Sequence, residues 1–257
     1  MSAERFDRYM ERALYGPDGF YATDGSAGRR RGDFITSPEV GPLFGAVVAE
    51  AIDRWWTDAG NPDPFTVYDV GCGPGTLLKA IRLARPERPW HLIGVDVAGD
   101  AADLTELPED LRGAVVIGNE LLDNLPFRIV ERRTDGYHEV HVADGQEVLA
   151  PLAVDEDHPA GMSVGGPPDI PVGTRAPLMT EAAIWVQRVL DRNPLVVCLF
   201  DYGAPETVEL ATRGGWLRTY RQHQRGTNPL IDPGSMDITT DVGWDQLPRP
   251  DELLTQT

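Results

Sequence analysis

The sequence predicts an α/β fold with a mostly parallel sheet and helices on both of its faces. Residues 65–70 are rich in β-branched and aromatic residues and are bounded by turn residues, as is typical of a strand buried on both faces of a parallel sheet. A glycine turn follows, and a helical pattern begins directly after it at Thr76. Similar strand segments occur at 90–95, 115–118 and 195–200, which favours repeated strand and helix units.

The glycine turn, Gly71-Cys72-Gly73-Pro74-Gly75, is expected at the carboxyl edge of this sheet. Ligands of open α/β folds bind at that edge, because helix amides point into the crevice and glycine lets a ligand approach the backbone. A plain tight turn is the alternative, but three alternate glycines exceed what turning requires. We therefore expect a ligand-binding loop.

The residues around the glycines indicate the ligand. A dinucleotide fingerprint would need glycine in place of Thr76, and Asp69 would repel a phosphate, which argues against a nicotinamide-dependent oxidoreductase. Asp69 followed by Gly71, Gly73 and Gly75 instead resembles motif I of class I S-adenosylmethionine (SAM) methyltransferases. SAM carries a sulfonium and an ammonium group and no phosphate, so its charge suits Asp69.

The N-terminal part of the chain predicts two helices. Helical spacing over 4–14 indicates a helical appendage ahead of the core. Ser37 is a suitable N-cap and Pro38 a suitable first residue for a second helix, which extends to about Thr57. A crossover helix is expected over 76–85.

Two acidic segments follow the next strands. Asp96 ends the strand 90–95 and is a candidate ligand of the cofactor's ribose hydroxyls, although a simple turn former is the alternative. Only eighteen residues (97–114) lie between Asp96 and the strand 115–118, which is short for a helix plus another strand. That strand brings Asn119, Glu120 and Asp123 to the sheet edge of the glycine loop.

The remainder of the chain is less regular. Segments 127–133 and 137–142 alternate around Asp135-Gly136, which predicts an inserted β-hairpin. Residues 150–177 are rich in proline and glycine and are expected to form a loop. A helix is predicted over 178–190, and 214–241 shows no clear period.

The composition bounds the function. With 23 Lys and Arg against 41 Asp and Glu, the net charge is −18, which argues against nucleic acid or an anionic membrane surface as the main partner. A cationic protein is a better candidate, although acidic surfaces also simply favour solubility. Two cysteines without metal-ligand or disulfide spacing predict no metal, and the absence of an export signal or long apolar segment favours a cytoplasmic protein.

Five segments together resemble the MidA family of SAM-dependent methyltransferases, which includes a mitochondrial complex I assembly factor. They are residues 32–39 (GDFITSPE), the loop 69–75, residues 119–126 (NELLDNLP), Asp201-Tyr202-Gly203 and Asp237-Ile238-Thr239. The resemblance implies a class I, Rossmann-like methyltransferase fold and, from the mitochondrial member, methylation of a protein arginine, with a respiratory-complex subunit as a candidate substrate.

The resemblance also implies roles for individual residues. SAM would be held by six residues, Asp69, Gly71, Gly73, Gly75, Asp96 and Asn119. Glu120 and Asp123 are the catalytic candidates, because paired carboxylates orient a guanidinium and one of them accepts its proton. Capping of a following turn is the alternative role. The substrate-side candidates are Asp33, Phe34, Thr36, Glu39, Tyr202 and His223.

We expect one domain over 1–257. It comprises an N-terminal helical segment (1–60), a cofactor-binding core (65–126), a hairpin and loop insertion (127–177), and the C-terminal half of the core (178–257), truncated relative to family members. The alternative function is a non-catalytic assembly protein that keeps the SAM fold. The short 97–114 link and the early C-terminus favour it, whereas the retained glycine loop and the Glu120 and Asp123 pair disfavour it. The oligomeric state is open.

Overall fold

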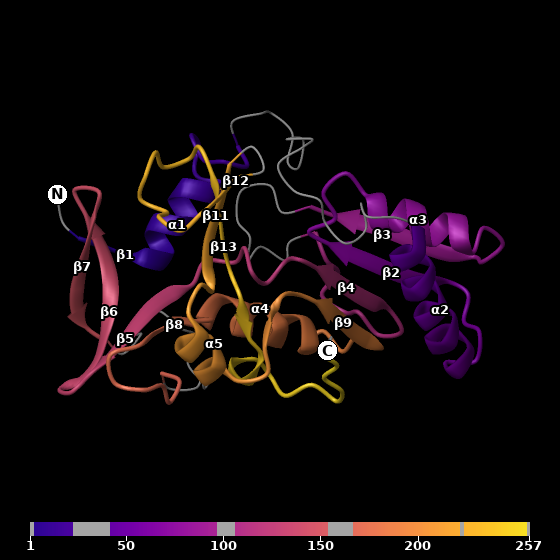
Figure 1. Ribbon diagram of the computed structural model, residues 1–257. Coiled ribbons are helices and arrows are strands. Elements are labelled where there is room, and N and C mark those ends of the chain that lie inside the picture. The colour runs from indigo at the N-terminus through magenta and orange to yellow at the C-terminus, as the bar shows by residue number, and fades with distance from the viewer. Residues whose placement is uncertain (1–2, 23–41, 97–105, 154–166, 222–223, 256–257) are drawn as a thin grey trace.

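A computed structural model of the chain describes residues 3–22, 42–96, 106–153, 167–221 and 224–255 (Figure 1). Its parallel sheet has the order β3-β2-β4-β9, built from β3 (Trp90–Val95), β2 (Phe65–Val70), β4 (Val115–Asn119) and β9 (Val196–Phe200). All neighbouring pairs are parallel. The predicted strands and the predicted α/β class are confirmed.

The register of the sheet aligns the carboxyl ends of its strands. Val70, the last residue of β2, pairs with Val95 on one side and with Gly118 on the other. Asn119 at the end of β4 pairs with Phe200 at the end of β9. The loops after these four strands therefore lie at one edge of the sheet, as the sequence predicts.

Helices cover both faces of this sheet. α2 (Pro42–Asp58) and α3 (Thr76–Ala84) lie on one face, and α4 (Thr180–Leu190) lies on the other. Because side chains alternate along a strand, β2 and β4 contribute to two core clusters. Phe65, Val67, Val115 and Ile117 pack with α2 and α3, whereas Tyr68, Val70 and Val116 pack in the cluster that contains Trp185 of α4.

The predicted hairpin belongs to a larger antiparallel sheet, drawn at the left of Figure 1. β5 (Arg128–Arg133) and β6 (Gly136–Ala143) form the hairpin. β1 (Glu4–Arg5) and β7 (Gln146–Pro151) pair with β6, and β8 (Arg175–Leu178) pairs with β5. An ion pair between Arg128 and Glu139, 2.6 Å long and buried, joins β5 to β6.

Two segments without predicted regular structure contain strands. The expected loop 150–177 includes the end of β7 and most of β8, so that prediction is wrong at both ends. Residues 214–241 contain β11 (Leu217–Arg221), β12 (Gln224–Gly226) and β13 (Asp237–Thr240), which form a three-stranded antiparallel sheet in the order β12-β11-β13. These strands are short and carry few apolar residues, so their pattern does not reveal them.

The last short elements follow β9. β10 (Gly203–Ala204) pairs in parallel with β14 (Val242–Gly243). α5 (Thr207–Arg213) lies between them in the sequence, and the 3-10 turn η2 (Trp244–Gln246) follows β14. Among the helices of the described residues, none is long and apolar enough to cross a membrane.

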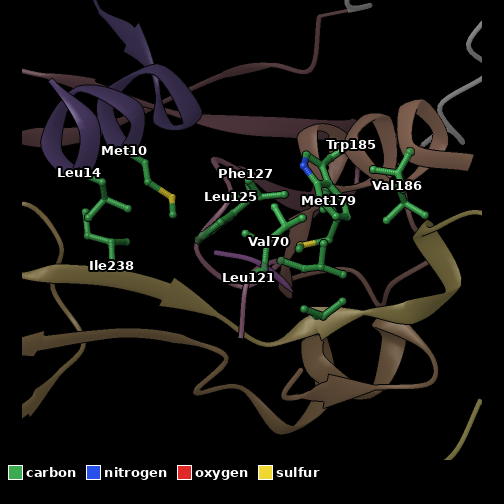
Figure 2. Close-up of a cluster of buried hydrophobic side chains, with 14 of the residues drawn as sticks. Met10, Leu14, Val70, Leu121, Leu125, Phe127, Met179, Trp185, Val186 and Ile238 are labelled. Carbon is green, nitrogen blue, oxygen red and sulfur yellow. The ribbon is translucent and has the colours of Figure 1, made fainter. Parts of the chain in front are cut away.

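The N-terminal helix packs into the largest core cluster. α1 (Phe6–Tyr15) buries Phe6, Met10 and Leu14. Figure 2 shows Met10 and Leu14 on the side of the cluster near Ile238 of β13, and Val70 and Leu121 in its centre. The N-terminal segment is thus tied to β13 by packing, which matters for the site described below. The predicted start of α2 at Ser37 and Pro38 lies outside the described residues.

Candidate functional site

The glycine loop between β2 and α3 has a backbone that requires glycine. Gly71, Gly73 and Gly75 have φ angles of 72°, 49° and 69°, a region that other L-residues rarely adopt. A side chain added at Gly73 or Gly75 would meet no atom of the described residues within 4 Å, so these residues leave space beside the loop. At Gly71 an added Cβ would lie 3.0 Å from Leu121 Cδ1, which places the next loop in contact with this one.

Asp69 is buried at the end of β2, directly before the glycines. Its side chain is 2% exposed, and its Oδ2 atom has no hydrogen-bond partner among the described residues. Burial raises the pKa of Asp69 to about 7, and the nearby charge of Asp96 adds to the rise. A buried carboxylate oxygen without a donor is costly, so the site is suited to a cationic or hydrogen-bond-donating ligand.

Cys72 of the glycine loop lies near Asp69 and Asp96. Burial raises the pKa of its thiol to about 11, and the charges of Asp69 and Asp96 add to the effect. The thiol is therefore protonated at neutral pH, which excludes it as a thiolate nucleophile. The charges of Asp69 and Asp96 both act on this cysteine, so the two carboxylates lie near the glycine loop.

The second loop, residues 119–124, follows β4 at the same edge. Glu120 has a φ of 50°, which is strained for a residue with a side chain, and its N–H donates to the Phe200 carbonyl oxygen at 2.8 Å. Asn119 Oδ1 is buried and has no hydrogen-bond partner among the described residues. Strained backbone of this kind persists where the surrounding contacts fix it, and functional sites are where it concentrates.

Asp123 is the buried acid of this second loop. The Thr239 hydroxyl donates to Asp123 Oδ2 at 2.5 Å, while Asp123 Oδ1 is buried and has no partner in the described part of the chain. Burial raises the pKa of Asp123 to about 7; the charges of Asp237 and Glu120 add to the rise, and the Thr239 hydrogen bond and Arg218 oppose it. The Asp123 carboxyl group thus has a pKa near neutrality, and its Oδ1 atom has no hydrogen-bond partner among the described residues.

Asp201 holds the second loop from the end of β9. Its Oδ2 accepts the N–H groups of Leu122 and Asp123 at 2.9 and 3.2 Å, and its Oδ1 accepts that of Tyr202 at 2.8 Å. Burial raises the pKa of Asp201 well above its usual value, and the charge of Asp123 adds to the rise, while the three N–H donors oppose it. Both carboxylate oxygens of Asp201 are therefore used to bind backbone N–H groups, two of which belong to the second loop.

Asp237 holds the loop from the other side, at the start of β13. Its Oδ1 accepts the Tyr21 hydroxyl at 2.8 Å and the Asn124 side-chain amide at 3.1 Å. Burial raises the pKa of Asp237 to about 6, with the Tyr21 and Asn124 hydrogen bonds opposing the rise. Asp123, Asp201 and Asp237 together are called the acid cluster below.

The comparison with family models decides the family of the chain. A model described as "Putative S-adenosyl-L-methionine-dependent methyltransferase" matches residues 96–253, which is more than half of the chain. The chain belongs to this methyltransferase family. The resemblance identified in the sequence and the class I fold it implies are thereby confirmed.

Named relatives of this family member are mitochondrial. The Drosophila melanogaster protein arginine methyltransferase NDUFAF7 homolog is 25% identical over 286 residues, covering 92% of this chain and 64% of the relative. The Xenopus tropicalis protein arginine methyltransferase NDUFAF7 is 36% identical over 304 residues, covering 94% and 66%. The chain thus spans just under two thirds of the length of these relatives.

A solved structure supports the fold. A Burkholderia thailandensis protein in complex with S-adenosyl-homocysteine superposes with a TM-score of 0.72 and 26% identity, covering 95% of this chain and 70% of that protein. S-adenosyl-homocysteine is the demethylated product of SAM, so that protein binds the product of methyl transfer.

In this methyltransferase family member, most of the described site candidates lie at one sheet edge. Asp69 lies in β2 near the glycine loop, the three glycines lie in that loop, and Asp96 directly follows the neighbouring strand β3. Asn119 ends β4, and Glu120 and Asp123 lie in the loop after it. Tyr202 is 54% exposed, and its carbonyl oxygen accepts the Val242 N–H at 2.8 Å. Its substrate role stays a prediction. Asp33, Phe34, Thr36, Glu39 and His223 lie outside the described residues.

The sequence did not assign roles to four residues that complete the site. Asp201, Asp237 and Thr239 stand in two segments that carry the family resemblance, but only the fold shows what they bind. Tyr21 follows α1 in a turn and carries no motif. Asp201, Asp237 and Thr239 could have been found from their place in short polar segments next to apolar strands. For Tyr21 we find no such indication in the sequence.

Proposed function

We propose that this chain is a SAM-dependent methyltransferase that transfers a methyl group to a protein side chain, with the arginine guanidinium as the acceptor. The observation that carries the proposal is a pair of buried carboxylate oxygens, Asp69 Oδ2 and Asp123 Oδ1, each without a partner among the described residues. Asp69 lies near the end of β2, directly before the glycine loop, and Asp123 lies in the second loop, which contacts the glycine loop through Gly71 and Leu121. Two separate sites for cationic groups at one sheet edge suit a sulfonium donor and a guanidinium acceptor. The family and the names of the mitochondrial relatives support the same assignment.

The cofactor fits the first loop. Among the described residues, none would contact a Cβ at Gly73 or Gly75, so a ligand can approach the backbone there, and Asp69 Oδ2 can accept a hydrogen bond from the ammonium group. Asp96 and Asn119 are the further candidates to hold it, Asp96 at the ribose. When bound, SAM supplies a methyl group activated by its sulfonium.

The acceptor fits the second loop. An arginine side chain is protonated in solution, so the nitrogen that takes the methyl group must release a proton. Asp123 Oδ1 can bind that nitrogen and accept the proton, because its pKa of about 7 suits proton transfer near neutral pH. Glu120 of the same loop is the candidate to bind a second nitrogen, so that the two carboxylates orient the planar guanidinium.

Methyl transfer from radiolabelled SAM to a protein-derived peptide tests this function. The probe is a set of peptides that differ only by Arg→Lys or Arg→Gln replacement, with the purified chain as the catalyst. We expect label in the arginine peptide alone, and loss of labelling in Asp123→Asn. Asp110→Asn is the control, because Asp110 is exposed and its partner among the described residues is the neighbouring Arg112.

The outcomes separate the alternatives. Label in the lysine peptide would keep the methyltransferase and reject arginine as the acceptor. SAM binding without transfer to any peptide or protein extract would favour the non-catalytic assembly protein. Absence of SAM binding by the folded chain would reject both.

A further inference from the structure

β13 presents two polar side chains to the second loop, and the proposed chemistry does not by itself require them. Asp237 and Thr239 are two residues apart on the strand, so their side chains point to the same face. Both are buried, with exposures of 2% and 3%. Thr239 binds Asp123, and Asp237 binds the adjacent Asn124.

Backbone contacts fix the relative position of β13 and the loop. The Thr240 N–H donates to the Asp123 carbonyl oxygen at 3.1 Å, and the Asn124 side-chain amide donates to the Ile238 carbonyl oxygen at 3.2 Å. The Tyr15 hydroxyl donates to the Asn124 carbonyl oxygen at 3.0 Å. The orientation of the Asp123 carboxylate is thus set from outside the parallel sheet.

β13 itself is anchored by its partner strand β11. Arg218 of β11 pairs with Thr239, and Tyr220 pairs with Asp237. Asp237 also accepts the Tyr21 hydroxyl, and Tyr21 stacks on Tyr15 with ring centroids 5.4 Å apart. The N-terminal segment, β13 and the loop therefore form one connected set of contacts around Asp123.

We propose that Thr239 and Asp237 are positioning residues for Asp123: Thr239 holds Oδ2 so that Oδ1 faces the substrate guanidinium, and Asp237 fixes the loop through Asn124 and Tyr21. The inference rests on the proposed methyl transfer. A hydroxyl that binds one carboxylate oxygen restricts the rotation of the group and leaves the other oxygen as the acceptor. Neither residue needs to touch the substrate.

Thr239 and Asp237 have opposite effects on the pKa of Asp123, so their roles can be distinguished by experiment. Facing it are Glu120 of its own loop, Asp201 after β9, Asp237 of β13, Arg218 of β11 and the Tyr21 hydroxyl; Arg218 also pairs with Asp241. The Thr239 hydroxyl stabilises the ionised carboxylate, whereas the Asp237 charge destabilises it. Removing the Thr239 hydroxyl should therefore raise the pKa of Asp123, and removing the Asp237 charge should lower it.

The test compares Thr239→Val, Thr239→Ser and Asp237→Asn with the wild type in SAM-dependent methylation of an arginine peptide between pH 5.5 and 9. For Thr239→Val we expect kcat to fall about tenfold or more. The rising limb of the pH profile should move to higher pH by about half a unit or more. Thr239→Ser should restore both, and Asp237→Asn should move the limb to lower pH. Calorimetry should show SAM affinity within about twofold of the wild type in all three.

A purely structural role would lower the amount of folded enzyme without moving the limb. The inference is overturned if Thr239→Val keeps the wild-type kcat and limb, or if the two variants shift the limb in the same direction. If the wild type transfers no methyl group, the proposed function fails on its own. Carbon-13 titration of the aspartate carboxyl groups then still tests the positioning, because the Asp123 signal must shift in opposite directions in Thr239→Val and Asp237→Asn.

Discussion

The two loops that follow β2 and β4 meet at one sheet edge but are built in different ways. The glycine loop is defined by contiguous residues, from Asp69 to Thr76, and its conformation follows from three glycines with positive φ. The loop 119–124 carries one strained residue, Glu120, and is held by groups from β9, β13 and the N-terminal segment. The described residues leave space beside the backbone of the glycine loop, whereas hydrogen bonds from several segments hold the loop 119–124 in place.

This difference corresponds to the two tasks of a methyltransferase. A cofactor that is the same in every turnover can be held by a local backbone motif with open space beside it. An acceptor that must lose a proton as it reacts requires a carboxylate of fixed orientation and adjusted pKa, which only several segments together provide. The predictions below test whether the two loops are separable in this way.

The largest effect is expected at Asp123. Replacing it by asparagine removes the proton acceptor but keeps the size of the side chain, so turnover on an arginine peptide should fall by about 100-fold or more. SAM affinity should stay within about twofold, because Asp123 lies on the acceptor loop. Steady-state kinetics and calorimetry on the same preparation measure both, with Asp110→Asn as the surface control.

If Asp123→Asn lost SAM affinity by as large a factor as it lost turnover, cofactor binding and acceptor binding would not be assigned to separate loops. Turnover close to that of the wild type would remove Asp123 from the mechanism and leave Glu120 as the remaining acidic candidate.

The second prediction concerns the pH dependence of stability. Burial raises the pKa of Asp69 from 3.8 to about 7, so the folded chain holds a proton there that the unfolded chain has already lost. The stabilising contribution of the protonated form is therefore complete below pH 4 and is lost as the pH rises to about 7. Asp69→Asn should remove this dependence and raise the free energy of unfolding at pH 8 by on the order of 2–4 kcal/mol.

Urea denaturation at pH 5 and pH 8 measures this prediction. The wild type should be less stable at pH 8, and Asp69→Asn should reduce the difference between the two values. Asp110→Asn, on the surface, should leave the difference as it is. Equal pH dependence in the wild type and Asp69→Asn would show that Asp69 is ionised in the folded state at both values.

The smallest expected effect is on the reactivity of the two thiols. Cys72 has a pKa of about 11, raised by burial and by the charges of Asp69 and Asp96, so alkylation by iodoacetamide at pH 8 should be slow. Asp69→Asn removes one of those charges and should speed alkylation of Cys72 about twofold to threefold. Cys198, whose pKa is raised to about 11 by burial alone, is the internal control and should not change. Equal acceleration at both cysteines would indicate general loosening of the fold.

The sequence predicted the glycine loop and its strand and helix because every residue that shapes them is local. The β2 run, the glycines and the helix from Thr76 follow each other directly, and the structure confirms each boundary to within a residue. The apolar strands β3, β4 and β9 were predicted for the same reason. Asp96 directly follows β3 at the same sheet edge, and its predicted contact with a ribose stays a prediction.

The surroundings of Asp123 could not be predicted in the same way. Tyr21, Asp201 and Asp237 reach it from positions separated by up to 216 residues, and no local period marks such pairings. β11, β12 and β13 were missed because they are short strands with few apolar residues, and because Asp237 and Thr239 of β13 are buried polar residues that contact the second loop. Polar residues in that position break the alternation by which a strand is usually found. The sequence thus indicated which segments carry site residues, but it did not predict how these segments come together around Asp123.

Calorimetric titration of SAM into Asp69→Asn and Asp123→Asn, compared with the wild type, tests the separation of the two loops most directly. The buried oxygen of Asp69 is assigned to the cofactor, so its loss should weaken SAM binding by about tenfold or more. The loss of the Asp123 carboxylate should leave SAM binding as in the wild type. Equal weakening in both variants, or unchanged binding in Asp69→Asn, would contradict the assignment of one loop to the cofactor and the other to the acceptor.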